Sequence, residues 1–270
     1  MSLSTNELGI AYGEQLIVEN LNLEIPKGKI TTLIGPNGCG KSTILKTVAR
    51  IHRSKTGAVY LNGSAIQQMS TKAIAKQLAI LPQTPEAPNG LTVYELVSYG
   101  RFPHQKGMGR LSAVDRRMIE WSLHVTGVEA FYNRPLEALS GGQRQRVWIA
   151  MALAQETELL LLDEPTTYLD LAHQLEILKL LEKLNRDEGR TILMVIHDLN
   201  HAARFAHHMV ALNGGTIIQE GTPQEVMKTE VLKKVFQIDA VIVEDPHTGK
   251  PVCLTYDLIE RKVGSKLAIG

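Results

Sequence analysis

The stretch 35–43 combines glycines with a lysine and two hydroxyl residues, a composition suited to binding a polyphosphate. It fits the pattern G-x-x-x-x-G-K-[ST]. Its residues are Gly35, Pro36, Asn37, Gly38, Cys39, Gly40, Lys41, Ser42 and Thr43. Glycines let backbone N–H groups turn toward an anion, and the N-terminus of a following helix adds a favourable potential. We therefore expect this loop to bind a nucleotide, with Lys41 at the β- and γ-phosphates and Ser42 on Mg²⁺.

Two adjacent carboxylates, Asp163 and Glu164, directly follow the aliphatic run 159–162. A strand this apolar is expected inside a sheet, which places both carboxylates at its carboxyl end beside the phosphate loop. Asp163 would then hold the Mg²⁺ shell, directly or through water, and Glu164 would polarise the water that attacks the γ-phosphorus. Together with the phosphate loop, the run predicts a nucleoside triphosphatase. The sequence has no Asn-Lys-x-Asp motif and no arginine-rich lid, which argues against a GTPase and a nucleotide kinase.

Short aliphatic or alternating runs predict the strands that must position these groups. The runs are 3–12, 16–25, 29–34, 57–61, 159–162 and 191–196. Helical spacing predicts helices at 41–50, 93–99, 115–126, 144–153 and 171–184. Strands that alternate with helices indicate a parallel sheet covered on both faces. The expected fold class is α/β: a P-loop NTPase core with a parallel sheet, N-terminal antiparallel β strands and an inserted helical lobe.

Composition limits the classes of protein to which the chain can belong. Its 270 residues suffice for one large domain or two small ones, and 44% hydrophobic with 21% charged residues is typical of a globular chain. A net charge of +1 gives no electrostatic reason to expect nucleic acid or acidic lipid as a partner. No apolar run approaches the roughly 18–20 residues that a membrane helix needs, and the first residues do not resemble a signal peptide. We therefore expect that the chain does not cross a membrane by itself.

The two cysteines, Cys39 and Cys253, cannot form a disulfide framework and indicate a reducing compartment. Cys39 stands just before a predicted helix N-terminus, where the pKa of a thiol tends to fall. We expect alkylation of Cys39 to inhibit nucleotide hydrolysis and the bound nucleotide to protect it. An inward-facing, unreactive thiol is the alternative.

A second glycine-rich turn identifies a family. Leu139 is followed by Ser140, Gly141, Gly142 and Gln143, at the start of a predicted helix. This sequence resembles the signature of ATP-binding cassette (ABC) ATPases. Other positions match further features of that family in order. Tyr12 matches the aromatic residue that stacks on adenine, and Gln83 matches the glutamine between the core and the helical lobe. Asp170 matches the loop after the carboxylates, and His197 matches the switch histidine at the γ-phosphate. The resemblance implies ATP hydrolysis with Glu164, His197 and Gln83 as catalytic residues, and Mg²⁺ bound by Ser42, Gln83 and Asp163.

The resemblance also implies a dimer. A Ser-Gly-Gly turn at a helix N-terminus is expected to bind an anion, as the phosphate loop does. The chain would then have two sites for a γ-phosphate, although its phosphate loop binds only one nucleotide. The family resolves this with a head-to-tail pair that buries two ATP molecules. The residues implied to contact the partner subunit's nucleotide are Ser140, Gly141, Gly142, Gln143 and Asp170. Because this chain carries one cassette, a homodimer is expected.

The domain organisation that follows is a single ABC nucleotide-binding domain over 1–270. Its core would span 1–89 and 156–235, its helical subdomain about 90–155, and a C-terminal hairpin tail 236–270. Within this tail, the runs 241–244 and 251–256 flank a predicted turn.

The stretch 91–104 resembles the iron-chelate and vitamin B12 importer group, and the stretches 166–170 and 245–249 resemble its ferric-siderophore importer ATPases. The resemblance implies a peripheral subunit at the cytoplasmic face of the cell membrane. Its partners would be integral-membrane permease subunits and, indirectly, an extracytoplasmic substrate-binding protein, with no nucleic acid. Arg101, Phe102 and His104 would face the permease. The expected cargo is a ferric siderophore, and haem or a cobalamin is the second choice.

Other roles within the family are weaker hypotheses. DNA-repair cassettes insert long coiled coils between the phosphate loop and the signature, and this chain has no heptad stretch there. A regulatory cassette without hydrolysis is disfavoured, because Lys41, Asp163, Glu164 and His197 are all present. A soluble ATPase of Fe–S cluster assembly, or another role outside transport, remains the alternative.

Overall fold

The computed structural model describes residues 2–105 and 110–259, and its fold is the expected α/β class. Six strands form the central sheet in the order β11-β10-β4-β9-β8-β7. Their bounds are β4 (Ile30–Ile34), β7 (Leu78–Leu81), β8 (Leu159–Asp163), β9 (Thr191–Val195), β10 (His208–Asn213) and β11 (Thr216–Gly221). All neighbours are parallel except β10 and β11. β4, β8 and β9 are buried along their whole length, because helices or the second sheet cover both faces.

The N-terminal strands form a separate antiparallel sheet, as expected. Its order is β2-β1-β5-β6, with β3 paired to β1. The bounds are β1 (Leu3–Tyr12), β2 (Gln15–Leu21), β3 (Glu24–Ile25), β5 (Thr56–Leu61) and β6 (Ser64–Ala65), so the predicted strand 16–25 is two strands. The helix α1 (Lys41–Val48) packs between the two sheets, and its Ile44, Leu45 and Val48 are fully buried in the shared apolar core. The predicted end of this helix near Arg50 was two residues too late, because Arg50 takes a left-handed backbone at φ +59°.

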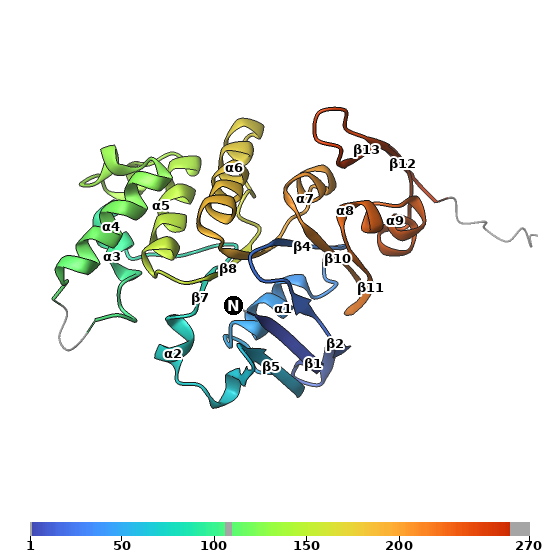
Figure 1. The fold of residues 1–270 in the computed structure, drawn as a ribbon, viewed down its shortest axis with the longest axis horizontal. Coiled ribbons are helices and arrows are strands. Elements are labelled where there is room, and N and C mark those ends of the chain that lie inside the picture. Colours follow the sequence, from blue (N-terminus) through green and yellow to red (C-terminus); the bar gives the residue numbers. More distant parts are fainter. Residues whose placement is uncertain (1, 106–109, 260–270) are drawn as a thin grey trace, which may run out of the picture.

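Three helices form a lobe at one end of the molecule, shown in green in Figure 1. They are α3 (Val93–Tyr99), α4 (Ala113–Thr126) and α5 (Gly141–Ala154), close to the predicted spans. Each begins with a capping box, in which a Ser or Thr side chain accepts from the third helical N–H group and the third side chain bonds back. Short local sequence patterns therefore determine where the helices of the lobe begin.

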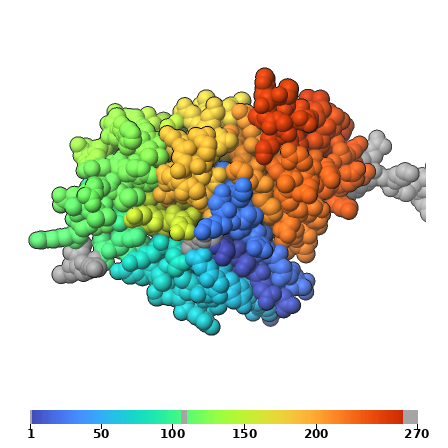
Figure 2. All heavy atoms as spheres, in the orientation of Figure 1, coloured from blue at the N-terminus to red at the C-terminus, as the bar shows by residue number. Residues whose placement is uncertain are grey.

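The opposite end of the molecule carries the C-terminal elements (Figure 2). They are α7 (Leu199–Phe205), α8 (Pro223–Val226), α9 (Thr229–Phe236) and a two-stranded hairpin of β12 (Ile238–Glu244) and β13 (Pro251–Leu258). The hairpin was expected, and its strands are longer than predicted. The remaining helices are α2 (Thr71–Ala75), α6 (Leu171–Glu188) and short 3₁₀ turns at Ile66–Gln68, Glu129–Phe131 and Leu136–Ala138. Within the described ranges no helix has both the length and the apolar composition to cross a bilayer.

Candidate functional site

The loop 35–40 runs from the buried end of β4 to the start of α1, the context that its motif requires. At Gly35 a side chain would overlap the carbonyl oxygen of Leu212. Gly40 caps α1 with φ +102° and offers no side chain, so the first-turn N–H groups of α1 have no side-chain cap. Lys41 is 5% exposed, and its Nζ donates to the carbonyl oxygens of Gly35 (2.8 Å) and Pro36 (2.9 Å). The loop thus forms a preformed anion cradle, with the lysine folded across it.

Asp163 ends β8 directly beside this loop. Its Oδ1 accepts a hydrogen bond from Ser42 Oγ at 2.8 Å, while its buried Oδ2 has no partner among the described residues. Burial raises the pKa of Asp163 above its ordinary value, against the opposing effect of the Ser42 hydrogen bond. A hydroxyl and an under-used carboxylate oxygen are the hard ligands that Mg²⁺ prefers, so the residues present fit that ion.

Glu164 is the centre of a hydrogen-bonded group at the ends of β8 and β9. Its Oε1 lies 2.6 Å from His197 Nε2. Its Oε2 accepts from Gln83 Nε2 (2.6 Å) and from Thr167 Oγ1 (2.9 Å). Burial acts to raise the pKa of Glu164, but the bonds from His197, Thr167 and Gln83 outweigh it and hold the pKa below its ordinary value. The structure therefore brings the three expected catalytic side chains together around an ionised carboxylate.

These groups face an open cleft of about 670 Å³. Its lining residues are Tyr12, Ile17, Asn37, Gly38, Gly40, Lys41, Ser42, Thr43, Gln83, Glu164, Thr167, Tyr168 and His197. Tyr12 stands at its edge, 50% exposed, and its ring is tilted against that of His52 with centroids 4.5 Å apart. No sequence pattern singles out His52 or predicts that Thr167 contacts Glu164. A hydroxyl residue three positions after a carboxylate is the local signal for the Thr167 contact.

Cys39 lies beside this cleft but not in its lining. The thiol is buried in the apolar core between the two sheets, 3.9 Å from Lys41 Nζ. Burial raises the pKa of Cys39, and the charge of Lys41 offsets only part of that effect. The expectation of a lowered pKa is therefore wrong, because the side chain faces inward while the backbone belongs to the loop.

The signature residues form a second, separate group. Ser140 caps α5, and its Oγ accepts from Gln143 N at 3.3 Å. A side chain at Gly142 would lie 2.5 Å from the ring of His173, while Asp170 Oδ1 accepts from His173 N at 2.9 Å. His173, which the sequence did not suggest, thus joins the turn to the start of α6. None of these residues lines the cleft that holds Lys41 and Glu164.

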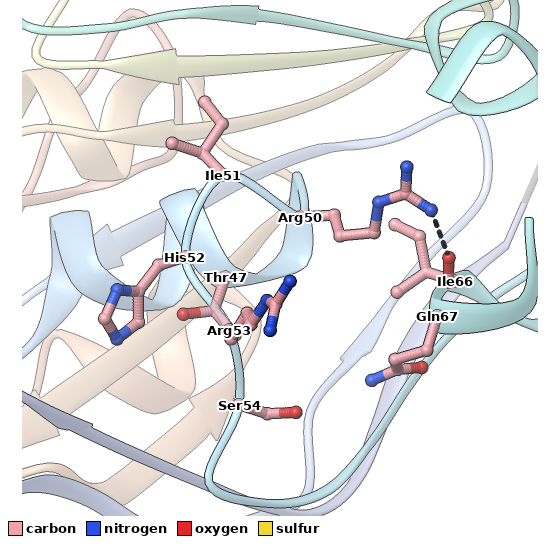
Figure 3. A pocket seen from close by; sticks show the side chains of 8 residues that line it. All are labelled: Thr47, Arg50, Ile51, His52, Arg53, Ser54, Ile66 and Gln67. Atoms are coloured by element: carbon pink, nitrogen blue, oxygen red, sulfur yellow. Dashed lines mark hydrogen bonds between the residues drawn. The ribbon is translucent and has the colours of Figure 1, made fainter. Parts of the chain in front are cut away.

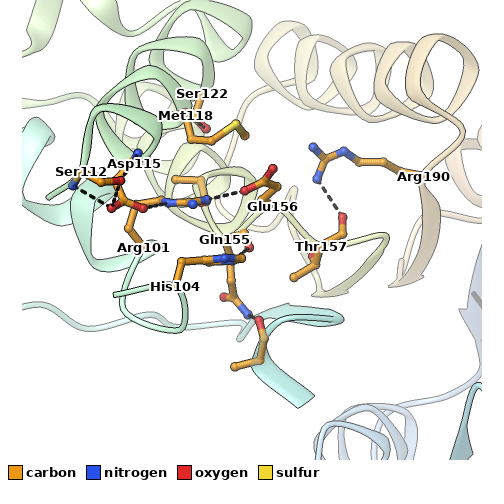
Figure 4. Close-up of polar contacts among 12 residues, drawn as sticks. Arg101, His104, Ser112, Asp115, Met118, Ser122, Gln155, Glu156, Thr157 and Arg190 are labelled. Atoms are coloured by element: carbon orange, nitrogen blue, oxygen red, sulfur yellow. Dashed lines mark hydrogen bonds and ion pairs between the residues drawn. The ribbon is translucent and has the colours of Figure 1, made fainter. Parts of the chain in front are cut away.

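Arg101 is not on the surface where it was expected. It is 2% exposed, and its Nε donates to Asp115 Oδ1 at 2.8 Å (Figure 4). Its Nη1 donates to the carbonyl of Ala154 (2.7 Å) and to Glu156 Oε2 (2.9 Å). The assignment of Arg101 to a permease-facing surface was wrong, because the guanidinium joins α4 to the end of α5. Phe102, next to it, is 58% exposed.

A second cleft of about 490 Å³ lies beyond the end of α1. Arg50 crosses it and donates from Nη1 to the carbonyl oxygen of Ile66 at 3.1 Å (Figure 3). The same nitrogen also donates to the carbonyl oxygen of Met69. His52 lines this cleft and also contacts Tyr12. The cleft contains no carboxylate and no residue expected in catalysis, so it is distinct from the phosphate cleft.

The comparisons with known proteins agree with this geometry. A model of the ABC transporter family matches residues 18–167. The chain is 74% identical to the iron(3+)-hydroxamate import ATP-binding protein FhuC of Bacillus subtilis (strain 168), over 97% of each chain. It is 43% identical to the ferric enterobactin transport ATP-binding protein FepC of Escherichia coli (strain K12), over 93% of this chain and 92% of that one.

Solved structures are similar as well. An inward-facing metal-chelate type ABC transporter matches with a TM-score of 0.81 and 28% identity, covering 96% of this chain and 97% of the other. A dimeric post-hydrolysis state of the cassette MJ0796, bound to ADP and Pi, matches with a TM-score of 0.72 and 32% identity, covering 82% and 98%. With these likenesses and a site of this composition, the chain belongs to the ATP-binding proteins of the ABC transporter family.

Proposed function

We propose that this chain hydrolyses ATP to energise a membrane permease that imports a ferric siderophore, with a ferric hydroxamate as the first candidate cargo. The observation that carries the proposal is the 74% identity, over 97% of this chain, to a protein named for iron(3+)-hydroxamate import. Relatives at 52% and 43% identity are named for achromobactin and ferric enterobactin transport. A soluble ATPase of Fe–S cluster assembly is not favoured, because these relatives are named for import or transport.

ATP binding would begin at Lys41. Its ammonium group now donates to two carbonyl oxygens of its own loop and would exchange them for β- and γ-phosphate oxygens. The first turn of α1 supplies further N–H donors toward the phosphates. Tyr12, half-exposed at the edge of the cleft, would present its ring to adenine.

Ser42 and Asp163 would hold Mg²⁺, with Gln83 as a further ligand. When bound, the ion neutralises part of the phosphate charge. The unpartnered Oδ2 of Asp163 supports this assignment, because ligation would give a buried carboxylate oxygen the partner that it lacks.

Glu164 would act as the general base for hydrolysis. Its carboxylate stays ionised at neutral pH, since the hydrogen bonds on it keep its pKa low. It would accept a hydrogen bond from the attacking water and so polarise it. Gln83 and His197, which now bond to this carboxylate, would turn from it toward the water and the γ-phosphate respectively.

The separation of the two glycine-rich turns supports a head-to-tail homodimer. Ser140, Gly141, Gly142 and Gln143 would close the cleft of the partner subunit, with Asp170 beside them. The dimer would sit at the cytoplasmic face of the membrane, held by permease subunits that receive cargo from an extracytoplasmic binding protein. The exposed Phe102 and the neighbouring His104 remain candidates for the permease contact.

Uptake of radioactive iron tests this proposal. Cells that lack the chain should regain uptake of a ferric hydroxamate with the wild-type protein and remain at background with Lys41→Ala. A ferric catecholate and haem, measured in parallel, define the range of cargo. Restored uptake of haem alone would contradict the ferric-siderophore assignment. Normal ATP hydrolysis by the purified chain without restored uptake of any chelate would contradict the import role.

A further inference from the structure

His197 connects the catalytic carboxylate to a short helix. It lies between the end of β9 and the start of α7, and its ring is 44% exposed, so packing alone does not fix it. Asp198 caps α7 by accepting from His201 N at 2.7 Å. A seven-residue helix is not stable in isolation, and its position must come from what it packs against. The orientation of His197 therefore depends on the contacts of α7.

One of those contacts is a two-bond pairing with the C-terminal hairpin. Asn200, in the first turn of α7, accepts from Cys253 N at 2.8 Å through its Oδ1 and donates from Nδ2 to Cys253 O at 3.2 Å. The amide side chain thus pairs with β13 as a neighbouring strand residue would. This pairing needs one donor and one acceptor on a short side chain, and Asn provides both.

The hairpin also holds the other end of α7. Lys250 Nζ donates to the carbonyl oxygen of Ala206 at 2.8 Å, at the C-terminal cap of the helix. Between these two ends, Ala203 and Phe205 of α7 are buried in the same apolar core as Ala240 of the hairpin. In Figure 1 the hairpin lies next to α7, away from the helical lobe. The hairpin therefore holds α7 at both ends, like a strap, and His197 directly precedes the N-terminal cap of this helix.

We propose that Asn200 is a positioning residue for ATP hydrolysis, which docks the C-terminal hairpin on α7 and thereby sets the orientation of His197 at the γ-phosphate. This inference rests on the proposed role of His197. Asn200 itself does not touch Glu164 or the phosphate cleft. Its effect passes through the hairpin and through Asp198 and Leu199, the two residues between His197 and Asn200.

The test compares Asn200→Leu with a matched change in α9, at another hydrogen bond to the same hairpin. Thr229→Val removes the hydrogen bond from Thr229 Oγ1 to Ala240 O (2.8 Å), which ties the hairpin to α9 and not to α7. We expect Asn200→Leu to lower kcat about tenfold, a fraction of the roughly 10²–10⁴-fold that a correctly positioned acid or base contributes, because His197 would be misoriented but still present. Its KM for ATP should stay within about twofold, because binding uses other elements. Thr229→Val should leave kcat unchanged. Thermal unfolding of both variants shows whether each remains folded at the assay temperature.

A double variant separates positioning from general destabilisation. In the His197→Ala background, Asn200→Leu should cause no further loss in single-turnover hydrolysis, because the group that it positions is gone. A further tenfold loss would overturn the inference, and so would an equal loss in Thr229→Val. An impaired His197→Ala beside a fully active Asn200→Leu would overturn this inference alone. Full turnover by His197→Ala would overturn the proposed role of His197 and the inference with it.

Discussion

Asp163 carries an electrostatic cost when the cleft holds no nucleotide. The carboxyl group is buried at the end of β8, and only one of its oxygens has a partner among the described residues. An unpartnered buried polar atom costs about 1–3 kcal/mol. The site is therefore suited to the state in which a cation and phosphates fill it, and the protein without nucleotide is less stable for that reason.

This cost predicts a pH-dependent effect of Asp163→Asn on stability. The folded pKa of Asp163 is raised by burial, so the folded state binds more protons than the unfolded state between the two pKa values. The contribution of protonated Asp163 to the free energy of unfolding is present at low pH and is lost as the pH rises through the pKa of the folded state. We expect Asp163→Asn to be more stable than wild type by about 1 kcal/mol at neutral pH without nucleotide, with the difference shrinking in acid. Urea unfolding at several pH values measures it.

The exposed Asp239→Asn change serves as the control and should show no such trend. A wild-type protein that gains stability over Asp163→Asn as the pH rises would contradict the raised pKa. Addition of MgATP should reverse the order at neutral pH, because a charged carboxylate binds the ion more strongly than the neutral amide that replaces it.

At the residue scale, motif spacing predicted the groups that meet at the cleft. Lys41, Ser42, Asp163 and Glu164 follow from short patterns, because a phosphate loop and a carboxylate at the end of a buried strand are local features. The reactivity of Cys39 did not follow. Its pKa depends on burial between two sheets that lie far apart in the sequence, so the helix N-terminus alone gave the wrong direction.

At the scale of elements, the buried Arg101 joins parts of the helical lobe. It links the first turn of α4 to the end of α5, close to the residues that lead into β8. Burial acts to raise the pKa of Asp115, but the hydrogen bonds from Ser112 and Arg101 prevail and keep its pKa low. The pair is therefore charged inside the lobe, where loss of one partner leaves the other uncompensated.

Arg101→Met is expected to destabilise the chain by about 3–5 kcal/mol, the usual cost of removing one member of a buried ion pair. Urea unfolding of the full chain measures the change. The control is Arg186→Met on α6, which removes an exposed pair with Asp187 and should cost less than about 1 kcal/mol. Equal effects of the two substitutions would show that Arg101 is not a buried connection.

The helices of the lobe could be predicted from apolar spacing and capping boxes, which are local. The burial of Arg101 could not be predicted, because a Gly-Arg pair after a short helix has the pattern of a polar surface. Its burial depends on Asp115 and on the carbonyl of Ala154, which reach it only after the lobe has folded. The proposed domain boundaries at about 90 and 155 stay a prediction.

At the scale of the whole molecule, two glycine-rich turns at helix N-termini lie on different parts of one chain. The turn at Gly35–Gly40 opens into the cleft with Glu164, and the turn at Ser140 does not line that cleft. The Ser140 turn is exposed at the start of α5 and has no phosphate of its own chain to bind. A second copy that places this turn over the cleft would give both turns a role, which is the physical reason to expect a dimer.

Glu164→Gln tests this arrangement. The variant removes the general base while keeping a side chain of the same size, so ATP should bind without being hydrolysed and hold the dimer closed. We expect a monomer without nucleotide and a dimer with MgATP, measured by light scattering after gel filtration. Adding Ser140→Arg to the same variant should abolish the dimer while ATP still binds, because the arginine fills the space over the partner's nucleotide. A Glu164→Gln protein that stays monomeric with bound ATP would contradict the head-to-tail model, and a dimer that persists with Ser140→Arg would place the interface elsewhere.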